Sequence, residues 1–217
     1  MLPRVNFFTW ISLWRVPTIR VMINLARSDE NWELEDSLCK LMFKPILESN
    51  HPEWIALFPE VNICTQEINL LHNMQSQKYF LPVFENVLYP RFSGFYNVIF
   101  TLQSSPRTFT RLYDVTVWYT REKKMGSDEL IDLKEQFRPP TLLECFASKS
   151  KITVQIHVKS KLLSSIPVKR SKIEKWLEKS WVDKDQRLSN EKLHKISESM
   201  NKEFQHKDHV SIVTPLE

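Results

Sequence analysis

Trp54-Ile55-Ala56-Leu57-Phe58-Pro59-Glu60 is the stretch from which the organisation of this chain follows. It is an apolar run of strand length, with aromatic and β-branched side chains, and it ends at a proline followed by a carboxylate. This pattern predicts a buried strand that delivers Glu60 to the edge of a sheet. Ligands bind at such edges in open α/β sheets, so Glu60 is the first candidate site residue.

The composition sets the class of protein. The chain has 217 residues, which suits one domain with a tail, and it contains 7 Trp and 13 Phe but only 2 Gly. The aromatic content excludes a disordered chain, because disordered chains are poor in aromatic residues. Gly94 and Gly126 stand alone, so neither a dinucleotide-binding nor a P-loop fingerprint is present.

The net charge of +4 comes mostly from the part of the chain after Lys149. An ordinary solvated basic surface is the simplest interpretation, and attraction to anionic lipid headgroups comes next. Nucleic acid is not an expected partner, because no stacking or zinc motif accompanies the charge. The three cysteines are far apart, which predicts free thiols in a reducing compartment, and no metal site is predicted.

Hydrophobic patterning predicts the following elements along the chain. Val5 to Trp14 is expected to be a helix, buried in a core or lying at a membrane interface, and Asp29 to Ser49 is a helix that Pro45 bends or ends. Strands are expected at 112–119 and 151–158, with a helix from about 171 to 188. The segment 61–74 has no clear pattern, and no run reaches the ~18 apolar residues that span a bilayer.

Several motifs resemble those of the glycerolipid acyltransferases. Phe58-Pro59-Glu60 is similar to the third motif of that family, which continues Glu-Gly-Thr, whereas this chain continues Val61-Asn62. Met22 to Ser28, followed by Trp32, resembles the second motif and contains Arg27. The substituted Val61 restricts φ and brings a β-branched side chain where a glycine lets the backbone approach a phosphate.

Further motifs extend the resemblance from Met22 to Leu188. Asn86-Val87-Leu88-Tyr89-Pro90-Arg91, with Gly94 after it, is similar to the fourth-motif region, and we expect it to emerge as an extended strand. The resemblance implies an α/β fold, a mixed sheet flanked by helices. It also implies three regions: an apolar segment at 1–21 with a degenerate or truncated first motif, an acyltransferase-like domain at 22–188, and a polar tail at 189–217.

The resemblance also implies a binding site. Arg27, Glu60 and Arg91 are its predicted substrate-binding residues, because a guanidinium grips a phosphate through two parallel hydrogen bonds. Acyl-CoA and a lysophospholipid of the lysophosphatidic acid or lysophosphatidylinositol class are the implied substrates, with no resident cofactor. The implied location is the membrane surface of the endoplasmic reticulum, on its reducing, cytosolic side.

The catalytic motif of that family is missing. There, a His-x-x-x-x-Asp pair removes the proton from the acceptor hydroxyl. One alignment sets Arg4 at the histidine and Thr9 at the aspartate, and neither side chain can do that work. The other alignment starts the chain after the motif. All six histidines lie after Arg27, and His157 is expected to be structural.

Two functions therefore stay open. One is a lysophospholipid acyltransferase-like protein that is incomplete or inactive as this chain. The other is a catalytically silent relative that binds lipid or a partner protein. A generic soluble α/β domain is a third and weaker alternative. The acceptor headgroup, the acyl preference and the oligomeric state are not encoded in any motif.

Overall fold

A computed structural model describes residues 3–10, 24–28, 36–62, 64–104, 109–121, 137–147 and 151–210. The chain divides into two compact units. Unit 1 comprises Met1–Asp114 and Ser160–Asp183, and unit 2 comprises Val115–Lys159 and Lys184–Glu217. The combination of helices with small parallel and antiparallel sheets makes the chain a mixed α/β protein.

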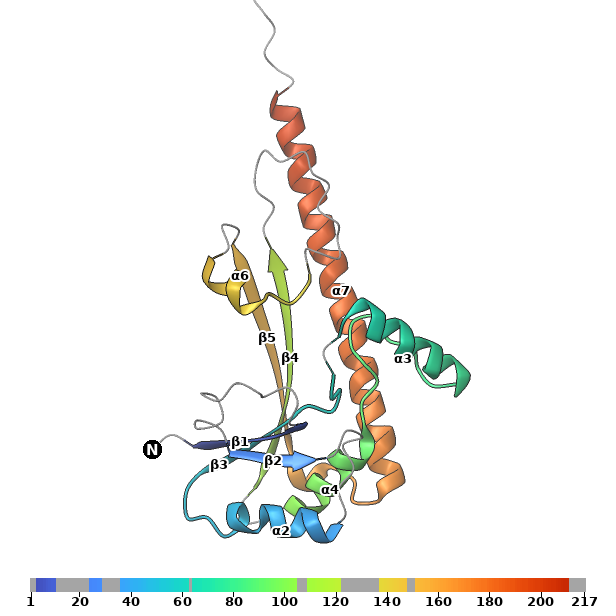
Figure 1. Cartoon of the computed structure of the whole chain (residues 1–217). Coiled ribbons are helices and arrows are strands. Elements are labelled where there is room, and N and C mark those ends of the chain that lie inside the picture. The colour runs from blue at the N-terminus through green and yellow to red at the C-terminus, as the bar shows by residue number, and fades with distance from the viewer. Residues whose placement is uncertain are drawn as a thin grey trace, which may run out of the picture. The chain divides into compact units, whose positions relative to one another are not determined.

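Unit 1 contains a three-stranded parallel sheet in the order β2-β1-β3 (Figure 1). The central strand β1 is Arg4–Trp10, and it lies between β2 (Asn24–Ser28) and β3 (Glu53–Leu57). Both pairings are parallel, so the carboxyl ends of all three strands lie at one edge. This is the edge at which α/β proteins bind ligands.

The expectation of a helix at the start of the chain was wrong where the structure describes it. Val5 to Trp10 is part of β1, and 11–14 lie outside the described residues. A short apolar run has no periodicity that separates a buried helix from a central strand. Pairing on both sides of β1 decides the matter, because each side provides backbone hydrogen-bond partners.

The predicted strand at Trp54 is confirmed as β3, but it is not fully buried. Trp54 is 60% exposed, because β3 lies at the edge of the sheet and pairs only with β1 among the described residues. The following helix prediction is confirmed in its described part, α2 (Asp36–Leu47), while 29–35 lie outside that part. Pro45 lies inside α2, and the helix ends two residues later.

Two helices of unit 1 were not predicted. α3 (Gln66–Lys78) begins where the Thr65 hydroxyl accepts a hydrogen bond from the Ile68 N–H, and α4 (Phe92–Gln103) follows Arg91. The segment before α4 was expected to be an extended strand, and this was wrong: residues 81–91 form irregular backbone. Pro82 and Pro90 lack the N–H that a strand ladder needs.

The core of the chain lies in unit 1. The largest fully buried side chains all belong to this unit. Some come from α2, from α4 and from the segment before α4. The others come from the short 3-10 helix η2 (Leu163–Ser165) with the residue after it, and from the first turns of α7 (Arg170–Val210). They are Phe43, Leu88, Pro90, Val98, Ile99, Ile166, Ile173 and Leu177. These contacts hold α4 in place, and α4 begins directly after the candidate residue Arg91.

The strands β4 (Arg111–Arg121) and β5 (Ile152–Leu162) pair only with each other among the described residues. The backbone N–H of Leu163 donates to Thr110 O at 2.9 Å, so the start of β4 meets the end of β5 and the pair is antiparallel. Both strands were predicted. Among the described residues, the strands form two separate sheets in place of the expected mixed sheet.

In unit 2, the short helix α6 (Leu142–Ala147) begins with a capping box. The Thr141 N–H donates to the Glu144 carboxylate at 2.7 Å, and the Glu144 N–H donates to the Thr141 hydroxyl at 3.2 Å. The Thr141 backbone bond, joined by Arg138, lowers the pKa of Glu144 to about 2. α7 continues to Val210 because no Gly or Pro interrupts it, and it includes most of the predicted polar tail.

No helix in the described ranges is both long and apolar enough to cross a bilayer.

Phe80 has an unfavourable backbone conformation at the end of α3. Its φ is 56°, in the left-handed region that disfavours side chains larger than glycine. The Phe80 N–H donates to Gln77 O at 3.3 Å and the Leu81 N–H to Ser76 O at 2.8 Å, which is a Schellman motif with Phe80 at the glycine position. The side chain is 97% exposed, so no burial offsets the strain.

We predict that Phe80→Gly stabilises the chain. Relief of about 1–2 kcal/mol of left-handed strain exceeds the greater freedom that glycine gives the unfolded chain, about 0.5–1 kcal/mol. Urea unfolding followed by circular dichroism should therefore show a gain of up to about 1 kcal/mol. Phe80→Ala keeps the strain and should stay near the wild type. A loss of stability in Phe80→Gly would contradict this account.

Candidate functional site

The candidate site is built on two tight turns after β3. The Val61 N–H donates to Phe58 O at 3.0 Å, which closes a β-turn with Pro59 at its favoured second position. The Asn62 N–H then donates to Glu60 O at 2.6 Å, and this γ-turn is centred on Val61 with φ 63°. A γ-turn with positive φ at its centre is rare and strained.

Two hydrogen bonds join these turns to the segment before α4. The Arg91 N–H donates to Pro59 O at 2.7 Å. The Glu60 carboxylate accepts from the Leu88 N–H at 3.2 Å. The structure therefore brings the backbone of Arg91 next to the turn that carries Glu60, although 31 positions separate the two residues. Their role as substrate-binding residues stays a prediction. The Arg91 side chain is exposed, so its guanidinium is accessible to a ligand.

His72 is a further residue of this site, which the sequence did not single out. It is half-buried on α3, and burial together with the positive charge of Arg91 lowers its pKa. Asn69, three residues earlier and so on the same helix face, donates from Nδ2 to Glu85 O at 3.0 Å. That bond holds this face of α3 toward the segment that carries Arg91. The lowered pKa favours the neutral imidazole of His72 near neutral pH.

Arg27 and Thr9 lie next to each other in the sheet. The register of β1 and β2 pairs Thr9 with Arg27, one residue before each strand ends. Both positions are thus at the carboxyl edge of the parallel sheet, the edge from which the chain leaves β3 toward Glu60. Of the predicted substrate-binding residues, Arg27 therefore lies at this edge, and Glu60 follows three residues after the end of β3.

Arg4 lies at the opposite end of β1 from Thr9. Five residues along a strand span about 16 Å, so the pair aligned with the missing His and Asp is not brought together. Arg4 instead forms an ion pair with Glu53 and donates to the Ser49 hydroxyl at 2.6 Å. Burial by itself raises the pKa of Glu53, but hydrogen bonds from Asn6, Ser49 and Arg4, with the Arg4 charge, hold it below its ordinary 4.5.

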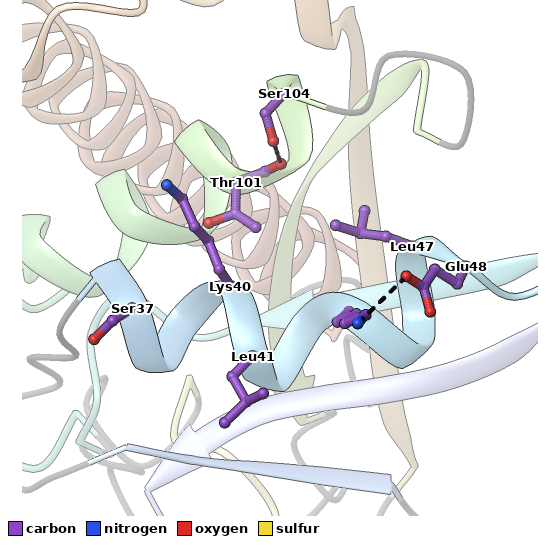
Figure 2. A pocket seen from close by; sticks show the side chains of 8 residues that line it. Ser37, Lys40, Leu41, Leu47, Glu48, Thr101 and Ser104 are labelled. Carbon is purple, nitrogen blue, oxygen red and sulfur yellow. Dashed lines mark hydrogen bonds and ion pairs between the residues drawn. The ribbon is translucent and has the colours of Figure 1, made fainter.

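Other polar groups are less suited to bind a substrate. An open groove of ≈ 500 Å³ lies between α2 and α4, and Figure 2 shows Lys40 and Thr101 projecting toward each other across it. Lys44 at its rim is 4.0 Å from Glu48. No group of three or more His, Cys, Asp or Glu side chains gathers as a metal site in the described ranges. His157 contacts Arg187. Both residues belong to unit 2, whereas the residues predicted for the site belong to unit 1.

Curated proteins similar to this chain are acyltransferases. It is 27% identical over 158 residues to 1-acyl-sn-glycerol-3-phosphate acyltransferase 2 of Brassica oleracea, covering 72% of this chain and 36% of that protein. It is 26% identical over 184 residues to the probable 1-acyl-sn-glycerol-3-phosphate acyltransferase 5 of Arabidopsis thaliana, covering 84% and 44%. Lysocardiolipin acyltransferase 1 of Gallus gallus is 24% identical over 157 residues, covering 72% and 37%.

These relatives support a relationship to the glycerolipid acyltransferases. The chain spans less than half the length of each of these relatives. No protein-family model matches the chain, and no solved structure matches it. The relationship therefore rests on sequence similarity that runs through most of the chain, together with the Phe-Pro-Glu turn and its arginine.

We predict that Glu53→Gln destabilises the chain at neutral pH by about 2 kcal/mol, the typical size of a charged hydrogen-bond network. The folded pKa of Glu53 is lowered, so its contribution is complete above pH 4.5 and is lost as pH falls through the folded pKa. Urea unfolding at several pH values should show the two proteins converging in acid. The control Glu48→Gln removes an exposed pair and should change stability by less than about 0.5 kcal/mol.

A second prediction concerns the strain at Val61, which is only 7% exposed. Both Val61→Ala and Val61→Gly lose buried surface, but only glycine relieves about 1–2 kcal/mol of left-handed strain. Val61→Gly should therefore be less destabilising than Val61→Ala in urea unfolding.

Val98 in α4 is the matched control, because it is fully buried in a regular helix. There the order should reverse, with Val98→Gly about 1 kcal/mol less stable than Val98→Ala. The same order at both positions would contradict the strain at Val61.

Proposed function

We propose that this chain is an acyltransferase-like protein of phospholipid metabolism that binds the headgroup of a lysophospholipid at the carboxyl edge of the β2-β1-β3 sheet. One observation carries the proposal. The 2.7 Å bond from the Arg91 N–H to Pro59 O holds the glutamate of the Phe-Pro-Glu turn near an exposed arginine, in a chain similar to lysophospholipid acyltransferases.

The proposed roles follow from charge and accessibility. Arg91 provides a guanidinium that grips a phosphate through two hydrogen bonds, and no ion pair occupies it within the described part of the chain. Arg27 is a second cation at the same sheet edge, by its register with Thr9. The Glu60 carboxylate, which accepts from the Leu88 N–H, is the proposed acceptor for a glycerol hydroxyl. The endoplasmic reticulum membrane is the proposed location.

Acyl transfer from acyl-CoA is the second candidate function, and His72 favours it. A neutral imidazole can remove the proton of the acceptor hydroxyl. The hydroxyl oxygen then attacks the thioester carbonyl, the C–S bond breaks, and CoA leaves as the thiol after it takes up a proton. The chain then needs neither the missing histidine nor its aspartate. Without this transfer step, the chain is a silent relative that only binds lipid, as in the first candidate function.

Binding and transfer should be measured on the same protein. Calorimetry with short-chain lysophosphatidate should show binding, and Arg91→Gln should weaken it at least about tenfold, the usual loss for a charge-assisted hydrogen bond. Arg111→Gln, which removes an exposed arginine of β4, is the matched control and should leave affinity unchanged. Equal affinity in the Arg91→Gln and wild-type proteins would contradict the assigned site.

The transfer assay uses labelled oleoyl-CoA with a panel of lysophospholipids that includes lysophosphatidic acid and lysophosphatidylinositol. Transfer that is lost in His72→Gln but retained in His51→Gln would support the second candidate. Background transfer with intact binding would support the silent relative. Transfer that survives Glu60→Ala would remove Glu60 from the site.

A further inference from the structure

α3 exposes its apolar side chains and directs polar ones inward. Leu70, Leu71 and Met74 are 64%, 59% and 61% exposed. On the other side of the helix, Ser76 is buried and Asn69 hydrogen-bonds to Glu85 O. A surface helix of a soluble protein normally has the reverse arrangement. The packing of the described residues therefore does not account for the apolar side of α3.

Further exposed apolar side chains follow at the end of the helix and just after it. Tyr79, Phe80 and Val83 are 63%, 97% and 46% exposed. We call the whole surface the α3 apolar face, and its members are Leu70, Leu71, Met74, Tyr79, Phe80 and Val83. All six residues belong to unit 1. Figure 1 shows α3 and the segment that follows it.

Phe80 provides a second, independent observation. The Schellman turn holds its backbone at φ 56°, and its side chain is almost completely exposed. Folding gains nothing from a strained residue that buries no surface. Strained positions persist where they serve binding, and a rigid turn that projects an aromatic ring outward fits that pattern.

The charges near the face indicate what covers it. The Lys78 ammonium lies 5.6 Å from the centre of the Tyr79 ring, and the sequence has no Asp or Glu from Ile68 to Phe84. Aromatic rings with a neighbouring lysine suit the headgroup layer of an anionic bilayer. A second copy of the chain, placed face to face by a twofold axis, would bring two Lys78 side chains together.

We propose that the α3 apolar face docks the chain onto a bilayer that contains anionic phospholipid. The choice of a lipid surface as the partner rests in part on the proposed function. His72 lies on the inward side of the same helix, so docking through α3 would bring the headgroup site to the membrane from which its substrate comes.

The test is the binding of the full chain to vesicles of phosphatidylcholine and phosphatidylserine, measured by co-sedimentation. Leu70→Ser/Met74→Ser and Phe80→Gly should each weaken partitioning about tenfold, as expected for large apolar side chains that no longer enter the lipid. Vesicles of phosphatidylcholine alone should bind the wild type more weakly. Leu193→Ser removes a leucine of α7 that is 65% exposed, and it should leave binding unchanged.

Phe80→Gly separates docking from folding, because it should stabilise the chain while it weakens vesicle binding. Unchanged vesicle binding in both face variants would overturn the proposal. A dimer seen by light scattering that the face variants dissociate, without any vesicle binding, would assign the face to a second copy instead. Short-chain lysophosphatidate in solution should bind Phe80→Gly normally, so failure of the headgroup site would appear separately, in Arg91→Gln.

Discussion

The candidate site depends on two hydrogen bonds, from the Arg91 N–H to Pro59 O and from the Leu88 N–H to the Glu60 carboxylate. Leu88 is fully buried and its segment has no strand partner in the described structure, so its N–H must find an acceptor elsewhere. Glu60 provides that acceptor. The Glu60 carboxylate therefore stabilises the fold and is also part of the candidate site. The exposed Arg91 side chain, in contrast, is able to bind a ligand without a second role in the fold. Substitution at Arg91 consequently reports on binding more directly than substitution at Glu60.

Both strained residues of the described chain lie near this site in sequence, and their strain has different meanings. Val61 is buried, so packing of its side chain offsets part of the cost of its left-handed backbone. Phe80 is exposed and has no such compensation. Glycine would adopt a positive φ at both positions without strain. The glycine within the described residues, Gly94, instead lies buried in α4. The first case is explained within the fold, and the second supports the proposed docking surface.

The two ends of β1 have separate roles. At the amino end, Arg4 and Glu53 join β1 to β3 through an ion pair that is buried on the Glu53 side. At the carboxyl end, Thr9 and Arg27 occupy paired positions on neighbouring strands. In one of the two alignments, the position of the family's histidine is thus occupied by Arg4, which stabilises the sheet. The histidine that we propose as a general base, His72, lies on α3 instead.

The sequence by itself determined the elements whose signals are local. Alternating β-branched residues specified β4 and β5, and an apolar stripe specified the first half of α7. It also suggested Glu60 and Arg91 as site residues, a role that stays a prediction. Tertiary structure decided what depends on contacts between distant segments. It made β1 a strand, because both partners of β1 lie later in the chain. It also divided the described strands between two sheets and left 81–91 irregular. It also placed His72 beside Arg91 and turned the apolar side of α3 outward, because helix orientation is set by the packing of the whole unit and not by the pattern of one segment.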